Sequence, residues 1–199
     1  MLFGLIIERT MAGLGLIQCL DLFETTYASG QDNTGGLTQA WYYAYAEDIL
    51  TWPTYVSKDS ATTPEQLMNY AGNFIMKPTK QFFEGYLTWG TGELKWDAQG
   101  PMDCKSSKHT FEISRPSASA NILAFIDLIK NANLVIICRD KDGDYRVIGS
   151  EFLAAKYDTD AGTTGKTGED YKGDVITFMS ELESAPKFYP GVIPVTPAS

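Results

Sequence analysis

The stretch NLVIICRDKDGDYRVIGSE, residues 133–151, constrains the fold of this chain more than any other. An apolar run from Leu134 to Cys138 leads to Asp142-Gly143, and the β-prone sequence YRVIG follows. Asp-Gly between two β-prone segments predicts a tight hairpin, because both central residues of a type I′ turn have positive φ. The chain is therefore expected to contain an antiparallel sheet built around this hairpin.

Other short segments extend the β pattern on both sides of the hairpin. They are rich in aromatic or β-branched residues and are separated by Gly, Pro and Lys clusters, which is typical of successive strands. In HTFEIS, the alternation places His109, Phe111 and Ile113 on one face. The remaining predicted strands read NFIM, QFFEGYLTW, ELKWDA and DVITFMSELESAP, the last with Val175, Thr177 and Met179 alternating.

One helix stands out in PSASANILAFIDLIKNAN, over about residues 117–131. Ser117 is suited to cap its N-terminus. Its polar side is weak, so we expect it to lie against a sheet and to be largely buried. The residues at helical spacing on its apolar face are Ile122, Phe125, Ile126 and Ile129.

These elements predict one mainly β domain with one flanking α-helix, an α+β fold of the sandwich or barrel kind. Residues 1–46 are rich in loop-forming residues and are expected to form an N-terminal extension or arm. Residues 47–185 would form the domain, with residues 158–174 as a long loop nearly free of large apolar side chains. Residues 186–199 carry four of the nine prolines and are expected to form an extended C-terminal arm.

The charge of the chain bears on its partners. Lys and Arg number 16 against 25 Asp and Glu, a net charge of -9. Specific nucleic-acid binding needs a basic surface, so we do not expect it here. A surface past which DNA slides without sticking remains compatible with this charge.

The cysteines and the N-terminus bear on the cellular compartment. Cys19, Cys104 and Cys138 are widely spaced and odd in number, which favours a reducing cytoplasm over a disulfide framework. The apolar N-terminus contains Glu8 and has no uninterrupted run of about 18 apolar residues, so neither a signal peptide nor a membrane span is predicted. An internal methionine leaves two possible translation starts, Met1 and Met11.

The stretch DAGTTGKTG resembles a phosphate-binding loop, because it ends in Gly165-Lys166-Thr167. The first glycine of that pattern is replaced by Asp160, whose charge repels phosphate. No helix start follows, so no N-terminal helix dipole meets the ligand. We therefore predict a flexible loop without nucleotide, and no cofactor.

DKDGDYRVIGSE partly matches a calcium loop, with Asp140, Asp142, Asp144 and Glu151 at positions 1, 3, 5 and 12. Position 6 requires glycine, and this chain has Tyr145 there. Predicted strands also flank the segment where helices are needed. We therefore expect a solvated hairpin tip and no metal site.

No catalytic group is predicted. His109 is the only histidine and has no Ser, Cys or carboxylate next to it in sequence, which favours a structural role over a general base. Glu93 and Asp97 are a formal carboxylate pair for glycoside chemistry, but a strand with polar edges explains them equally well.

Three stretches in this order resemble structural proteins of tailed bacteriophages: EDILTWPT at 47–54, RDKDGDYRVIGSE at 139–151 and PKFYPGVI at 186–193. The shared pattern is an acidic-Trp-Pro segment, a hairpin and a closing Phe-Tyr-Pro-Gly. The matching proteins are tail-tube or tail-associated proteins, and the likeness covers most of residues 47–193. The first 46 residues have no counterpart in it.

The resemblance implies a small β-sandwich or barrel that stacks as hexameric rings in the virion tail, after synthesis in the host bacterial cytoplasm. The helix at 117–131 would flank the sandwich, and the loop at 158–174 and both terminal segments would be assembly elements. Partners would be further copies of the chain and other tail or connector proteins. DNA would be passing cargo, and no membrane is implied. Lys166 is then expected to contact solvent or a carboxylate of a neighbouring subunit.

Alternatives stay open at this point. Within the class of virion proteins they are a head-tail adaptor, a tail-completion protein and a capsid decoration protein. From another class, a carbohydrate- or receptor-binding β-sandwich would use Trp41, Tyr42 and Trp52 as an aromatic platform. Core packing or interface packing is the more common role of such an aromatic cluster.

Overall fold

The computed structural model describes residues 34–58 and 60–197 of the chain. The described residues form a mainly antiparallel β structure with two α-helices, which confirms the predicted β-rich α+β class. Predictions that concern Met1, Met11 and Cys19 lie outside the described residues.

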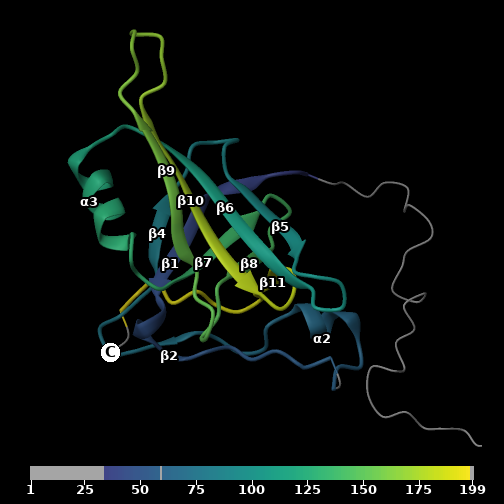
Figure 1. Ribbon diagram of the computed structural model, residues 1–199. Coiled ribbons are helices and arrows are strands. Elements are labelled where there is room, and N and C mark those ends of the chain that lie inside the picture. Colours follow the sequence, from purple (N-terminus) through teal and green to yellow (C-terminus); the bar gives the residue numbers. More distant parts are fainter. Residues whose placement is uncertain (1–33, 59, 198–199) are drawn as a thin grey trace, which may run out of the picture.

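Two sheets make up most of the molecule (Figure 1). The larger sheet contains β1 (Leu37–Tyr45), β4 (Phe83–Tyr86), β7 (Leu134–Asp140), β8 (Tyr145–Ile148) and β11 (Lys187–Phe188). Its spatial order is β11-β8-β7-β1-β4. The smaller sheet contains β5 (Glu93–Gln99), β6 (Ser106–Pro116), β9 (Lys156–Thr163) and β10 (Gly173–Leu182). Its order is β5-β6-β10-β9, and all neighbouring strands in both sheets are antiparallel.

The first core fills the space between the two sheets, as in a sandwich. Trp41 from the five-stranded sheet packs on Phe111 and Phe178 of the four-stranded sheet, with ring centroids 5.6 and 5.8 Å apart. Its partner directly across the ladder on β4 is Gly85, and a Cβ there would overlap the indole ring. The remaining buried residues of this core are Leu37, Leu87, Ile113, Ile129, Leu134, Ile136, Cys138, Ile148, Ala155 and Ile176.

A second core lies on the opposite face of the five-stranded sheet. It explains the continuous apolar run of β7, because strands covered on both faces lose the polar alternation. Ile136 faces the first core, whereas Val135 and Ile137 face the second. The other buried residues of the second core are Ala44, Ile49, Tyr70, Phe74, Met76, Phe82, Val147 and Tyr189.

The segment between β1 and β4 covers this second core. It contains a 3-10 turn η2 (Ala46–Asp48), β2 (Ile49–Thr51), α2 (Pro64–Met68) and β3 (Ile75–Met76), with β2 paired to β3. The short helix α2 begins after Thr63 in extended conformation and has proline at its first position. Proline is favoured there because its missing N–H has no helical partner in any case.

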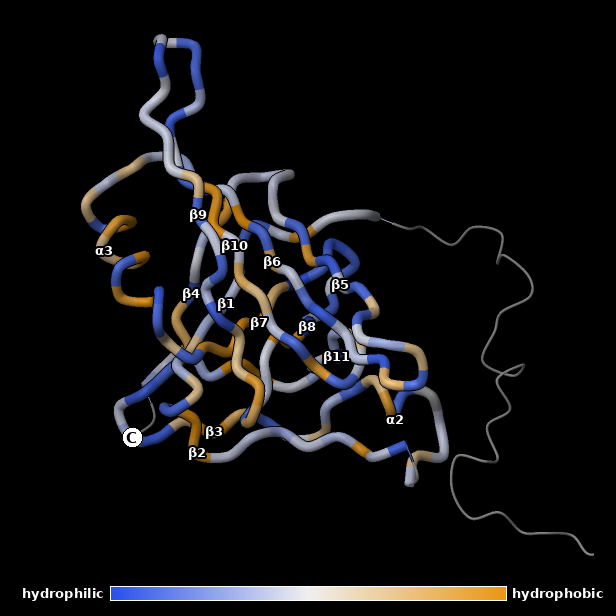
Figure 2. Tube along the Cα trace, viewed as in Figure 1, coloured by the Kyte–Doolittle hydropathy of each residue, from blue (hydrophilic) through white to orange (hydrophobic). Residues whose placement is uncertain are grey.

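The predicted flanking helix is confirmed as α3 (Ala120–Ile129). It lies beside β4 and β9 in Figure 1, and Figure 2 shows it largely in apolar colours. Its N-cap is Ser119, whereas the expected cap Ser117 has a φ of 81° and lies before the helix. Its buried and half-buried residues are those predicted: Ile122, Phe125, Ile126 and Ile129. The expectation that the helix is largely buried is wrong, because Leu123, 52% exposed, and Leu128, 70% exposed, lie on a face turned to solvent.

The predicted β7–β8 hairpin is confirmed, but its turn type differs. Gly143, with a φ of 106°, has positive φ, whereas Asp142 does not. The Gly143 N–H donates to the Asp140 carbonyl at 3.0 Å, and the Asp140 N–H donates to the Asp144 carbonyl at 2.8 Å. The connection is therefore a three-residue loop with one left-handed glycine, a common hairpin alternative to the type I′ turn.

The boundary expected at residue 47 is corrected. Residues 37–45 were assigned to an N-terminal arm, but they form β1, which pairs with both β7 and β4 inside the five-stranded sheet. The clustered aromatics hid this strand, because Trp41 and Ala44 face opposite cores and a bulge lies between Leu37 and Trp41. Leu37 is buried, so the domain begins at least ten residues earlier than expected.

The expected long loop at 158–174 is corrected as well. Residues 158–163 belong to β9 and residues 173–174 to β10, and the ladder continues until Thr163 faces Gly173. Only residues 164–172 connect the two strands. The two strands of this hairpin pair through backbone hydrogen bonds, which need no apolar side chains. A polar composition therefore predicted a loop where the chain forms an exposed hairpin. Figure 1 shows this hairpin projecting from one end of the sandwich.

The expected C-terminal arm at 186–199 is corrected for its described part. Lys187 and Phe188 form β11, and Tyr189 is buried in the second core. The Tyr189 hydroxyl accepts the Phe74 N–H at 3.1 Å and donates to the Val192 carbonyl at 2.8 Å. Farther along, the Phe82 N–H donates to the Pro194 carbonyl. The prolines thus hold an extended segment that is packed along the domain.

Candidate functional site

The phosphate-loop-like residues Gly165, Lys166 and Thr167 lie at the tip of the β9–β10 hairpin. The N–H groups of Lys166 and Thr167 both donate to the Asp170 carboxylate, at 2.8 and 2.7 Å. These bonds hold the pKa of Asp170 below its usual value. The chain's own anion thus occupies the donors that would receive a phosphate, and β10 follows where a helix is required.

The calcium-like acids do not form a metal site, and the first of them is engaged by a cation of the chain itself. Asp140 forms an ion pair with Arg146 at 2.6 Å. Among the described residues, no three His, Cys, Asp or Glu side chains are grouped in a way that would hold a metal ion.

His109 lies fully buried on β6. Its Nε2 lies 2.9 Å from the Ser184 carbonyl, so Nε2 carries the proton and donates. Burial lowers the pKa of His109, against the smaller opposing effect of this hydrogen bond. Its contacts are those of a packed neutral imidazole.

Glu93 and Asp97 lie on β5, on the face turned away from the core. They lie four positions apart along the strand, which corresponds to about 13 Å and exceeds the carboxylate spacings of glycosidases. Glu93 pairs instead with Lys95 at 2.8 Å. They do not form a catalytic pair.

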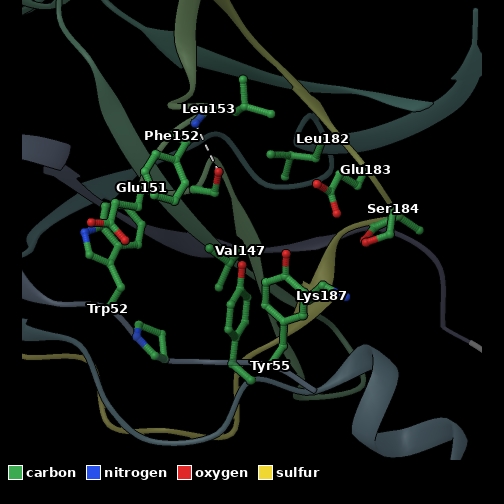
Figure 3. Close-up of a pocket in the computed structure, with 14 residues that line it drawn as sticks. Trp52, Tyr55, Val147, Glu151, Phe152, Leu153, Leu182, Glu183, Ser184 and Lys187 are labelled. Carbon is green, nitrogen blue, oxygen red and sulfur yellow. Dashed lines mark hydrogen bonds between the residues drawn. The ribbon is translucent and has the colours of Figure 1, made fainter. Parts of the chain in front are cut away.

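The proposed aromatic platform does not exist as expected. Trp41 is 2% exposed and belongs to the first core, and Tyr42 is half-buried beside Tyr145. Trp52 faces a different feature, a cleft between three segments that are far apart in sequence (Figure 3).

This feature, the Trp52 cleft, has a volume of about 190 Å³. Its walls come from the segments on both sides of α2, from β8 and the loop after it, and from the stretch that runs from the end of β10 to the start of β11. The lining residues are Trp52, Pro53, Tyr55, Tyr70, Val147, Ser150, Glu151, Phe152, Leu153, Leu182, Glu183, Ser184, Ala185 and Lys187.

Aromatic side chains form one wall of the Trp52 cleft. Trp52 packs edge-on against Phe74, and Tyr55 against Tyr70, with centroids 5.6 and 5.8 Å apart. Tyr55 is 45% exposed, so its ring is available to a ligand. Tyr70 is 8% exposed, and burial raises its pKa to about 12. The wall is anchored in the second core and open on one side.

Residues 150–153 form the opposite wall, as a turn that two hydrogen bonds close. The Ser150 N–H donates to the Leu153 carbonyl at 2.9 Å, and the Leu153 N–H donates to the Ser150 hydroxyl at 3.1 Å. This turn presents Phe152, 88% exposed, at the mouth of the cleft.

Charged groups of both signs line the same cleft. Glu151 and Glu183 are exposed carboxylates. The Nζ of Lys187 lies 2.6 Å from the Leu67 carbonyl oxygen and 4.3 Å from the centre of the Tyr55 ring. Burial lowers the pKa of Lys187, and Glu183 partly opposes that shift. The cleft therefore combines apolar faces with hydrogen-bond donors and acceptors.

Sequence reasoning found Trp52 but missed Tyr55, Tyr70 and residues 150–153. No periodicity links these positions, because the cleft is assembled only when β8, β10 and β11 come together. The one local signal was the apolar pair Phe152-Leu153 directly after the polar turn sequence Gly-Ser-Glu, in a place where exposure of apolar side chains is costly.

A scan against protein-family models finds no match, and searches of curated proteins and of solved structures find none either. No helix in the described part of the chain is long and apolar enough to cross a membrane. The cysteines Cys104, exposed, and Cys138, buried, are both free thiols.

Proposed function

We propose that this protein is a non-enzymatic structural protein of a phage virion tail, a tail-tube-like protein that self-assembles into rings. The observation that carries the proposal is the four-stranded sheet, whose two edge strands each pair with one described strand and whose outer face has no further layer of described chain over it. The resemblance of the three short sequence stretches to phage tail proteins supports this class of protein. The two edge strands of the sheet would supply the contacts between subunits.

Within the described residues, β5 pairs only with β6, and β9 pairs only with β10. Both edge strands are long, with seven and eight residues, and are mostly exposed. A row of unpaired N–H and C=O groups is a template for pairing with another chain. Joining β5 of one copy to β9 of the next is a head-to-tail contact, which closes into a ring when its rotation divides a full turn.

The outer face of this sheet is suited to line a channel through which DNA moves. Directly opposed pairs on β5 and β6 include Glu93 with Glu112 and Asp97 with Lys108. The alternate residues of β10 predicted from sequence, Val175, Thr177 and Met179, lie on the same outer face. Such a mixed surface on a chain of net charge -9 favours passing cargo over bound nucleic acid.

The β9–β10 hairpin supports stacking of one ring on the next. Its strands run beyond the sandwich and its surface is almost wholly polar, as Figure 2 shows. Asp170 keeps the tip folded through its two backbone bonds. We expect Lys166 at this tip to contact a carboxylate of the adjoining subunit or solvent. The proposed location is the virion tail, after synthesis in the host bacterial cytoplasm.

The test is the size and shape of the purified full chain, measured by light scattering over a range of concentration and ionic strength and by electron microscopy. Rings or tubes are expected, with hexamers as the proposed unit. Single rings without stacking would favour the head-tail adaptor or tail-completion alternative, and binding only to capsids would favour a decoration protein. Monomers under every condition would overturn the proposal.

A shortened hairpin sharpens this test. Thr163 and Gly173 face each other across the ladder, so a two-residue Asn-Gly turn can replace residues 164–172. This variant should form rings that no longer stack. Gly168→Ala is the matched control, since a Cβ there meets nothing within 4 Å.

A further inference from the structure

The Trp52 cleft has no part in the proposed assembly. It lies where β8 and β10 end and β9 begins, whereas the hairpin tip lies at the opposite end of β9 and β10. Three large apolar side chains remain exposed at its mouth, and exposed apolar groups that adjoin a cleft commonly mark a binding site. They are Tyr55, 45% exposed, Leu153, 48% exposed, and Phe152, 88% exposed.

A polar group at this place is free to bond to a ligand. The Tyr70 side chain is more than nine-tenths buried and lines the cleft. Its hydroxyl makes no hydrogen bond to any other described residue, whereas the buried hydroxyl of Tyr189 makes two. The Tyr70 oxygen is open to solvent at the cleft, so a ligand hydroxyl can displace water and bond to it.

The charges in the cleft restrict what that ligand is. Glu151 and Glu183 repel an anion. The Lys187 ammonium lies over one face of the Tyr55 ring, 4.3 Å from the ring centre, and its charge repels a ligand cation. A neutral ligand that both donates and accepts hydrogen bonds fits best, because carboxylates accept while lysine and tyrosine donate.

The aromatic wall completes the description of the ligand. Aromatic rings have electron-rich faces that attract weakly positive C–H groups, and one face of a sugar ring presents such groups. A cavity of about 150 Å³ accepts benzene, so the volume of about 190 Å³ is large enough for one six-membered ring. We propose that the Trp52 cleft binds a neutral pyranose sugar, stacked on Trp52 and Tyr55 and hydrogen-bonded to Tyr70 and Glu183.

The test uses the full chain and saturation-transfer NMR with defined sugars. The probes are the methyl glycosides of glucose, galactose, mannose and N-acetylglucosamine, each up to about 100 mM, which exceeds millimolar dissociation constants. At least one is expected to bind, with its ring C–H protons receiving the strongest transfer. N-acetylneuraminic acid, choline and a peptide of residues 1–10 represent an anion, a cation and an apolar peptide.

Two variants locate the binding. Tyr55→Ala should abolish the signal, while Trp89→Ala, which removes a 73% exposed tryptophan elsewhere, should leave it unchanged. Tyr70→Phe keeps the ring and removes the hydroxyl, and should weaken binding by about five-fold to ten-fold. Its control is Tyr171→Phe, whose hydroxyl donates to Arg115 on the hairpin side of the molecule.

Three results would overturn the proposal. They are no binding by any of the neutral sugars, binding that survives both Tyr55→Ala and Tyr70→Phe, and stronger binding of choline, the acidic sugar or the peptide than of every neutral sugar. None of these results bears on ring formation, which is measured separately by light scattering.

Discussion

At the scale of single residues, the pairing of Trp41 with Gly85 shows how one glycine makes room for the largest side chain of the first core. The indole lies over the β4 backbone at the place where any Cβ would overlap it. Sequence predicted that Trp41 belonged to an aromatic cluster with a packing role, and its burial confirms that role. Nothing in the sequence identified Gly85, because its role depends on a strand more than forty positions away.

Gly85→Ala should therefore destabilise the fold by about 1–3 kcal/mol, because the added methyl group forces Trp41 out of its packed position. Urea unfolding followed by fluorescence measures the change. Gly35→Ala is the control, since a Cβ at that position meets nothing within 4 Å. Equal stability of the two variants would show that Trp41 does not depend on the close approach.

His109 gives the chain a pH dependence of stability with a defined sign. Burial lowers its pKa in the folded state, so below the unfolded value of about 6.5 the unfolded chain binds the extra proton first. The free energy of unfolding should fall as pH drops from about 6.5 to about 5. His109→Gln, which retains a donor for the Ser184 carbonyl, should flatten this slope. An unchanged slope in the variant would assign the effect to other groups.

At the scale of elements, the sequence predicted the strands and the helix whose residue pattern can be recognised within the segment itself. β6, α3 and the β7–β8 hairpin were found, because alternation, helical spacing and Asp-Gly each report on neighbouring residues. β1 and β9 were missed, since one carries mixed aromatics facing two cores and the other is ordered by backbone pairing alone. The Trp52 cleft was predicted only through Trp52, because its three walls meet only in the folded chain.

The tip of the β9–β10 hairpin depends on one carboxylate. Asp170→Ala removes the acceptor of the Lys166 and Thr167 N–H groups, so hydrogen exchange at these two amides should become faster. Global stability should change little, because the tip is exposed. Glu169→Ala, a neighbouring acid with neither bond, is the control. If the two variants exchange alike, Asp170 does not organise the tip. Neither variant is expected to bind nucleotide.

At the scale of the whole molecule, the C-terminal segment completes the second core. Truncation after Ala185 removes β11 and the buried Tyr189 from the second core. The segment between β1 and β4, which covers this core, should then no longer unfold cooperatively. Removal of residues 196–199 should leave the melting temperature unchanged. Tyr189→Phe provides a milder test, with an expected loss of about 1–3 kcal/mol from the unpaired Phe74 N–H. A truncated chain as stable as the full chain would contradict this role.

The central place of β7 has a consequence for how the protein reaches its structure. Its flanking strand β1 is distant in sequence, as the bond between Thr38 and Arg139, 101 residues apart, illustrates. The β7–β8 hairpin can form early, but its apolar strand then waits for a partner that arrives by a long chain closure. During that interval LVIIC is an uncharged, β-prone edge of the kind that drives aggregation. Refolding yield should therefore fall steeply with protein concentration, and slow dilution at low concentration should recover the native protein.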